Sequence, residues 1–249
     1  MCVLCGILIT YMTIRTSFIG RTFDNFAKRG TLEEQWIAAC KSARPSVVFV
    51  VTEKKEGRKG GFSGCVISRD GAVVTSLAPF QEDMTTCTVT GVDIENGQYC
   101  VPYKVLERRT EYGLAILEPL QKHQVPLPVL PISREFRKGT ASLVCKEVAL
   151  LYFWNPYSSY RVKGKTWNSG FAYPMTCRTH ISCVLSDRVA CVQQTMAGDA
   201  FGSVVIDRNG GLVGVVNNLM SLGKPERERL TLVALLRPGW RKDRGEARR

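Results

Sequence analysis

The sequence predicts an all-β protein made of two six-stranded antiparallel β-barrels, preceded by a short N-terminal helix. Three observations predict this class. Short β-rich segments recur from Ser46 onward. They are separated by Gly, Asp, Asn and Pro. A Pro-rich passage at 125–131 divides them into two series of about six. Regularly spaced short strands with turn signals are typical of barrels and sandwiches. Two series joined by a link favour two barrels.

Composition places the chain among globular proteins. It has 249 residues, of which 45% are hydrophobic and 22% are charged. This length suits one large domain or two small ones, and the hydrophobic share is enough for a sizeable core. A disordered chain would be poorer in hydrophobic residues, so that class is excluded.

Domain boundaries follow from changes of pattern along the chain. Residues 1–30 are interpreted as a leader, either disordered or a targeting segment. A two-barrel folded domain is expected over 31–236, with the first barrel at about 45–120 and the second at about 125–235. Residues 237–249 remain as a basic C-terminal tail.

A helix is predicted over 32–43. Thr31 begins a capping box that Glu34 completes, and apolar residues follow at helical spacing until the pattern ends before Pro45.

The strands are predicted from period and composition. The first series is 46–53, 62–68, 72–77, 85–90, 98–106 and 113–118. The second series is 141–147, 159–163, 180–186, 189–194, 202–206, 211–217 and 229–235. Tight hairpin turns are expected at 68–71 and 207–210, where Gly71 and Gly210 can supply a positive φ.

The formal net charge is +12, and part of this excess is local. The segment 237–249 holds six basic and two acidic residues, and a second basic cluster lies at 54–59. Two interpretations stay open: solvated surface segments, or attraction to nucleic acid or another polyanion. We find no helix-turn-helix, zinc-finger or RNA-binding signature in support of the second.

Ten cysteines are spread along the chain, several of them inside apolar strands, as buried free thiols are. Cys2 and Cys5 have no second pair at metal-ligand spacing, so neither a metal nor another cofactor is expected. A reducing compartment is the simpler assumption, which favours an intracellular location in cytoplasm, nucleus or an organelle lumen. The apolar run at 3–12 is too short to span a bilayer.

Five short motifs occur along the chain. The first is Ser63-Gly64-Cys65-Val66-Ile67-Ser68-Arg69-Asp70-Gly71, followed by a strand that ends at Thr75-Ser76-Leu77-Ala78. The others are Gly113-Leu114-Ala115-Ile116-Leu117, Phe136-Arg137-Lys138-Gly139, Gly198-Asp199-Ala200-Phe201-Gly202-Ser203 and Gly211-Leu212-Val213-Gly214-Val215. Together they resemble the HtrA/Deg family of trypsin-like serine proteases. The resemblance covers roughly 44–218 in the family's order, and it implies the two-barrel fold.

The resemblance breaks down at the catalytic positions. The family's histidine falls on Ala78, its aspartate on Gly113 and its serine on Ala200. Acyl transfer on this fold needs a hydroxyl nucleophile, an imidazole base and a carboxylate that orients it, and alanine and glycine supply none of these. The resemblance therefore implies a pseudoprotease, a protease fold without catalysis.

Other residues could in principle replace the missing catalytic groups. His123 is expected to be solvated in a linker and His180 to be an ordinary strand residue. Ser76 and Ser203 flank the lost positions without an identifiable base, and Asp199 is interpreted as a turn residue. A serine–lysine dyad stays open.

The resemblance also assigns an oxyanion loop to Gly198, Asp199, Ala200 and Phe201. Phe201 replaces a glycine of the family, and it either closes the oxyanion cradle or fills the space left by the missing triad. Pro79 restricts the backbone beside Ala78.

Three functions follow as hypotheses. The first is a non-catalytic module that binds an extended peptide or protein by strand addition along Val213, Gly214, Val215, Val216, Asn217 and Asn218. The second is a serine endopeptidase of this family with an unrecognised mechanism. The third is a polyanion-binding protein that uses its basic tail. The binding partner and the oligomeric state are left open.

Overall fold

The computed structural model describes residues 30–53, 59–80, 86–93, 97–123, 126–135, 139–153, 160–162, 165–167, 174–193, 201–221, 229–238 and 240. The chain divides into two compact units, residues 1–38 and residues 39–249. The first unit is described only from Gly30 onward. The second unit contains both barrels.

The predicted helix is confirmed as α2, Leu32–Ala43. Its first turn carries the expected capping box: the Glu34 N–H donates to Thr31 Oγ1 at 3.2 Å, and the Thr31 N–H donates to Glu34 Oε2 at 2.6 Å. The chain then enters the 3₁₀ turn η1, Arg44–Ser46, which contains Pro45. The helix therefore begins and ends where the sequence signals lie.

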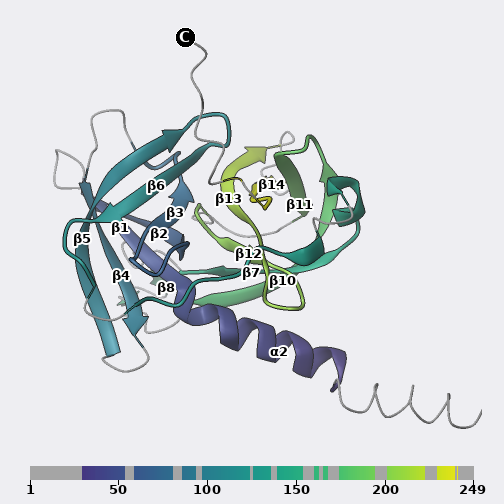
Figure 1. Cartoon of the computed structure of the whole chain (residues 1–249), viewed down its shortest axis with the longest axis horizontal. Coiled ribbons are helices and arrows are strands. Elements are labelled where there is room, and N and C mark those ends of the chain that lie inside the picture. The colour runs from purple at the N-terminus through teal and green to yellow at the C-terminus, as the bar shows by residue number, and fades with distance from the viewer. Residues whose placement is uncertain are drawn as a thin grey trace, which may run out of the picture. The chain divides into compact units, whose positions relative to one another are not determined.

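The first barrel is closed by six antiparallel strands in the order β1-β2-β3-β6-β5-β4 (Figure 1). The strands are β1 Val47–Glu53, β2 Lys59–Val66, β3 Val73–Ser76, β4 Thr86–Asp93, β5 Gly97–Arg109 and β6 Leu114–Pro119. Pairing of β1 with β4 closes the sheet. Closure leaves no free sheet edge in this barrel.

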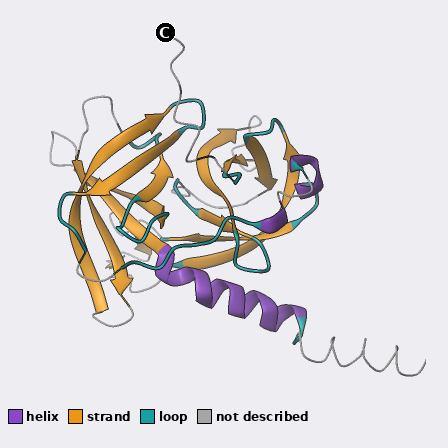
Figure 2. Cartoon of the chain, in the orientation of Figure 1, coloured by secondary structure: helices purple, strands orange, loops and turns teal. Residues whose placement is uncertain are grey.

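The second barrel is also closed, in the order β10-β11-β14-β13-β12-β7 (Figures 1 and 2). Its strands are β7 Glu147–Tyr152, β10 Met175–Val184, β11 Val189–Gln193, β12 Val204–Ile206, β13 Leu212–Ser221 and β14 Arg229–Leu235. A separate two-stranded sheet pairs β8, Tyr160–Val162, with β9, Lys165–Trp167. The predicted fold class is thus confirmed.

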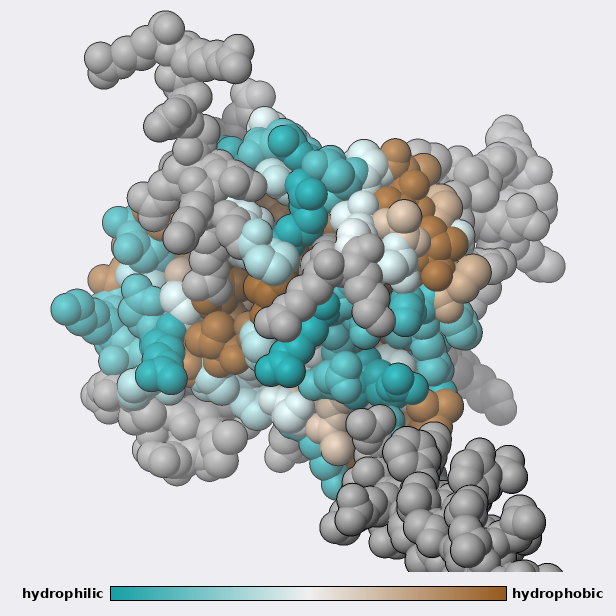
Figure 3. Space-filling model, turned by 45° about the vertical axis from the view of Figure 1, so that its right-hand side comes forward, coloured by the Kyte–Doolittle hydropathy of each residue, from teal (hydrophilic) through white to brown (hydrophobic). Residues whose placement is uncertain are grey.

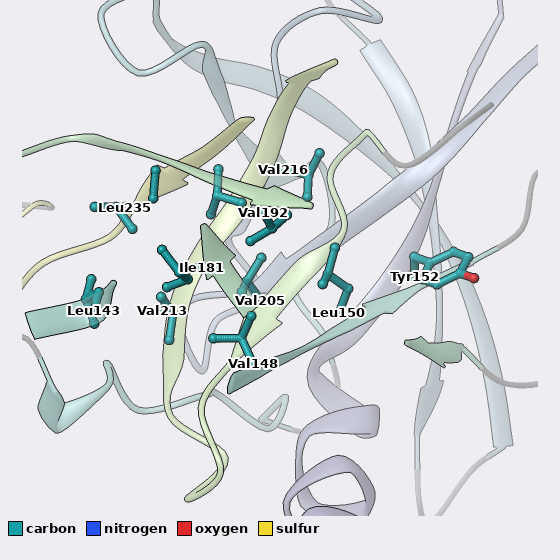
Figure 4. Close-up of a cluster of buried hydrophobic side chains, with 12 residues drawn as sticks. Leu143, Val148, Leu150, Tyr152, Ile181, Val192, Val205, Val213, Val216 and Leu235 are labelled. Atoms are coloured by element: carbon teal, nitrogen blue, oxygen red, sulfur yellow. The ribbon is translucent and has the colours of Figure 1, made fainter. Parts of the chain in front are cut away.

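Each barrel encloses its own hydrophobic core. The first core gathers residues such as Val50, Phe62 and Leu117, and the second gathers Leu150, Ile181 and Val216 (Figure 4). Several strands of these cores, such as β3 and β12, are buried along their whole length.

One predicted strand is wrong. The sequence predicted a strand over 141–147, but Thr140–Leu143 form the 3₁₀ turn η3, and the strand is β7, Glu147–Tyr152. Ser142 Oγ donates to the Gly139 carbonyl at 2.7 Å and stabilises the turn. The run from Val148 to Tyr152 is buried throughout, so it lacks the alternation that marks a half-buried strand.

The described surface carries scattered hydrophobic side chains. Figure 3 shows hydrophobic patches lying among hydrophilic residues on one face. Exposed large hydrophobic residues come from several different segments: Leu32, Ile37, Leu106, Leu120, Val144, Met175 and Leu185. Within the described residues, no helix is both long enough and apolar enough to cross a bilayer.

Candidate functional site

Ser63, in β2 of the first barrel, bonds to two segments of the second-barrel half of the chain. It is fully buried, and its Oγ accepts a hydrogen bond from the Phe153 N–H at 2.8 Å. Its own N–H donates to the Phe201 carbonyl at 3.1 Å. Its carbonyl accepts the Thr75 hydroxyl at 2.6 Å. Ser63 therefore links the end of β7 and the loop before β12 to the first barrel.

Gly202 allows this close approach of the two barrels. Its φ is +73°, and its N–H donates to the Val216 carbonyl at 2.8 Å. A Cβ at this position would lie 1.8 Å from the Ser63 carbonyl oxygen and 2.5 Å from Thr75 Oγ1. Backbone atoms cannot yield as a flexible side chain can, so only glycine fits here.

A second link joins β3 to β13. Ser76 Oγ donates to the Asn217 carbonyl at 2.9 Å, and the Asn217 carboxamide donates from Nδ2 to the Tyr112 carbonyl at 2.7 Å. One residue of the second barrel thus contacts both β3 and the β5–β6 turn of the first. These contacts fix how the two barrels meet.

The Asn217 side chain also lies against Gly113. A Cβ added to Gly113 would lie 3.0 Å from Asn217 Nδ2 and 3.4 Å from Asn217 Cβ. Gly113 has φ +63°, a conformation that most side chains disfavour. A side chain at position 113 would therefore press against the Asn217 carboxamide, which would have to shift by a few tenths of an ångström.

Solved serine-protease structures share this arrangement of barrels. The protease domain of MamO from Magnetospirillum magneticum aligns with a TM-score of 0.54 and 13% identity, over 78% of this chain and 93% of that chain. A serine endoprotease from Yersinia pestis aligns with a TM-score of 0.54 and 18% identity, over 80% of this chain and 62% of that chain. The chain has the trypsin-like serine protease fold. No protein-family model matches the sequence, and no curated protein matches it either.

Two of the three predicted triad positions are described, and they lie on neighbouring segments. The Leu77 N–H donates to the Gly113 carbonyl at 2.8 Å, so the chain preceding Ala78 lies beside Gly113. Ala78 is exposed in a turn that the Phe80 N–H closes on the Leu77 carbonyl at 2.9 Å. Ala200 lies outside the described residues.

The predicted oxyanion loop is described only at Phe201, because Gly198, Asp199 and Ala200 lie outside the described residues. The Phe201 ring is partly buried and packs against the core cluster of the first barrel. This contact favours the interpretation in which Phe201 fills space at the junction of the trypsin-like barrels.

The two histidines do not lie with the triad positions. His123 Nε2 lies 2.8 Å from the Tyr103 hydroxyl, and its ring packs against Gly71. The expectation of a solvated linker residue is therefore wrong: His123 is half-buried and held by the first barrel. His123 packs against Gly71, which precedes β3, whereas Ser76 at the other end of β3 lies at the junction. At a rise of about 3.3 Å per residue, the length of this strand separates His123 from the junction. His180 is exposed in β10, opposite Glu147, as expected of a strand residue.

The flanking serines are structural. Ser76 is fully buried, and its Oγ both donates to the Asn217 carbonyl and accepts the Ala78 N–H at 3.2 Å. Ser203 is fully buried as well. Neither hydroxyl is open to a substrate carbonyl.

Only part of the predicted peptide-binding strand has a side that another strand could pair with. Val204 pairs with Val215 on one side of β13, and Ala234 pairs with Val215 on the other. Both edges are occupied from Val213 to Val216, so a peptide cannot add there. From Asn218 to Ser221, β13 pairs with β14 alone among the described strands.

The last described residues return to the first barrel. Arg109 is 2% exposed, and its Nη1 donates to the Trp240 carbonyl at 2.5 Å. Its guanidinium also lies over the Trp240 ring at 5.3 Å and bonds Glu107 at 2.9 Å. Trp240 is 3% exposed, so it is packed although it belongs to the predicted tail. Residues 241–249 lie outside the described residues.

The sequence did not predict the contacts between the barrels. Ser63, Arg109 and Trp240 were not singled out as site residues, and Asn217 was predicted only as part of the peptide-binding strand. The only local signal was the position of Ser63 at the start of the family-like motif. Among the described residues, no group of three His, Cys, Asp or Glu side chains is placed to hold a metal ion.

Proposed function

We propose that this chain is a degenerate HtrA/Deg-like serine protease that lacks catalytic activity and binds an extended peptide or protein segment. The trypsin-like fold supports the relation to serine proteases. The sequence supports the lack of catalytic activity, since Ala78, Gly113 and Ala200 stand at the family's three catalytic positions.

The observation that carries the proposal is the packing at Gly113. A catalytic carboxylate at this position would orient the imidazole base. Here the residue has no side chain, its φ is +63°, and the Asn217 Nδ2 atom would lie in tight contact with an added Cβ, 3.0 Å from it. The surroundings of this position suit a residue without a side chain.

Inactivity is tested with a fluorophosphonate probe, which labels activated serines. We expect no labelling of the native chain, because the side chains of Ser76 and Ser203 are both fully buried. The heat-unfolded chain serves as the control for nonspecific reaction. Stoichiometric labelling of the native chain at Ser76 or Ser203, together with hydrolysis of fluorescent casein, would establish the competing endopeptidase hypothesis.

Peptide binding is proposed at the part of β13 that begins at Asn218. Strand addition needs an edge with unpaired backbone groups, and Asn218–Ser221 pair only with β14 among the described strands. Asn217 Oδ1 adds an acceptor next to this edge, since it is buried and has no partner within the described residues. A backbone N–H of a bound peptide would satisfy it.

The binding test uses the full chain. Peptides are selected from a random display library, and amide hydrogen exchange is then measured with and without a selected peptide. We expect new protection at 218–221 and no change in β12, which is already paired on both sides. Failure to enrich any peptide, or protection confined to other segments, would contradict the proposed edge.

A further inference from the structure

The second barrel carries two cysteines directly opposite each other. Cys183 of β10 pairs with Cys191 of β11 in the antiparallel register, and both are free thiols. Directly opposite residues in such a pair have Cα atoms about 4.5–5.5 Å apart. This spacing falls inside the range of about 4.4–6.8 Å that a disulfide spans.

A β-bulge sets this pairing. Ile181 is opposite Val192, but Cys183 is opposite Cys191, so β10 has one residue more than β11 between the two pairs. Without the extra residue, position 182 would face Cys191. Bulges re-aim side chains in this way. The bulge is therefore what brings the two thiols together.

The pair points outward from the barrel. Ile181 and Val192 both belong to the buried core, as Figure 4 shows, and Val184 and Ala190 pack with the same core. Cys183 and Cys191 lie between these two inward-facing pairs in the register. Because successive residues of a strand alternate between faces, both sulfurs lie on the outer face.

The two thiols differ in access. Cys183 is partly exposed, whereas Cys191 is 1% exposed. Burial raises the pKa of the Cys191 thiol to about 11, and a hydrogen bond with the Cys183 side chain acts in the same direction. Since the thiolate is the nucleophile, Cys183 meets a reagent from solvent first and Cys191 reacts second.

We propose that Cys183 and Cys191 form a thiol–disulfide pair that is oxidised by low-molecular-weight disulfides such as glutathione disulfide. The Cys183 thiolate attacks one sulfur of the oxidant, which forms a mixed disulfide and releases one glutathione. Cys191 then loses its proton to solvent and attacks the Cys183 sulfur, which releases the second glutathione. Two protein thiols are oxidised, and one glutathione disulfide is reduced to two thiols.

The sequence makes the product easy to detect. Arg188 lies between the two cysteines, so trypsin separates them into the peptides 179–188 and 189–208. The full chain is equilibrated with mixtures of reduced and oxidised glutathione, alkylated, and digested without reduction. We expect the two peptides to be joined by a disulfide. At pH values below the pKa of Cys191, the rate of disulfide closure should rise about tenfold for each unit by which the pH increases, because closure needs the Cys191 thiolate.

Two variants complete the test. In Cys191→Ser, we expect Cys183 to stop at the mixed disulfide with glutathione. Cys100→Ser is the matched control, because Cys100 is exposed but has Thr90 opposite it, and this variant should still form the cross-link. The cross-linked wild type should unfold at a higher denaturant concentration, since the link restrains the unfolded chain.

The proposal is overturned by either of two results. In one, wild-type Cys183 accumulates glutathione and never joins Cys191. In the other, both thiols stay reduced at mixtures that modify Cys100. Circular dichroism of each variant serves as the control that the fold is retained.

Discussion

At position 113 the backbone and its neighbours both favour glycine. A residue other than glycine in the left-handed region costs roughly 1–3 kcal/mol, although aspartate tolerates it better than most. Asn217 Nδ2 lies 3.0 Å from the place of the missing Cβ, so its carboxamide must move aside for any side chain.

We therefore expect Gly113→Asp to lower the free energy of unfolding by about 1–3 kcal/mol. The cost should be smaller in an Asn217→Ala background, because the crowding carboxamide is then absent. Urea unfolding of the two single variants and the double variant gives the coupling. Strict additivity would show that Asn217 does not oppose a side chain at position 113.

The same reasoning applies to restoring catalysis. We expect the triple variant Ala78→His, Gly113→Asp, Ala200→Ser to fold and to remain nearly inert. Pro79 restricts the backbone of residue 78, and Phe201 occupies the place of a small loop residue. Casein hydrolysis should require the further changes Pro79→Val and Phe201→Gly. Robust turnover by the triple variant alone would show that the site is intact apart from its side chains.

Cys87 makes stability depend on pH at the alkaline end. Burial raises the pKa of its thiol from 9.0 to about 12. Between these values the unfolded chain loses the thiol proton while the folded chain keeps it, so stability falls as pH rises from about 9 to 12. Cys87→Ala should reduce the slope by about 1.4 kcal/mol per pH unit, measured by urea unfolding between pH 9 and 11. If the slope of stability against pH is unchanged in Cys87→Ala, groups other than Cys87 cause the pH dependence.

At the scale of elements, the loop before β12 depends on Gly202. Gly139 provides a matched comparison, because its φ is +86° but no atom lies within 4 Å of its added Cβ. Both changes to alanine incur backbone strain of about 1–3 kcal/mol. Only Gly202→Ala also forces a Cβ against the Ser63 carbonyl oxygen.

We expect Gly202→Ala to destabilise the protein clearly more than Gly139→Ala, as measured by thermal unfolding. The larger loss reflects separation of the loop from β2, since the Ser63–Phe201 bond cannot form alongside the clash. Equal losses in the two variants would show that the close approach at Ser63 is not required.

At the scale of the whole molecule, the chain crosses between the barrels again at its end. Trp240 and Arg109 connect the segment after β14 to β5, and Arg188 adds a cation–π contact with Tyr112 at 5.0 Å. The barrels are thus held at Ser63, at Asn217 and at Trp240.

Two truncations test the last of these links. Deleting 240–249 removes Trp240 and leaves the buried Arg109 without one of its acceptors, so we expect a loss of roughly 3–5 kcal/mol, as for truncation of a buried tryptophan. Deleting 241–249 keeps Trp240 and is the control. If both truncations unfold at the same urea concentration, Trp240 does not hold the barrels together.

The sequence by itself determined the strands, the helix and the number of barrels. Short β-rich runs bounded by turn residues, the Thr31–Glu34 capping box and the glycines at positions 71 and 210 are local signals, because each depends on residues within a few positions of one another. They failed at Glu147–Tyr152, although β3 and β12 are buried to the same degree and were predicted.

The motif around Ala78 also predicts that the catalytic residues are replaced. Only the tertiary structure decided what lies beside the predicted positions. Asn217 and Tyr112 are 105 residues apart, and Arg109 and Trp240 are 131 apart. No local pattern encodes such partners, because they meet only after strand pairing has closed both barrels and brought distant turns to one junction.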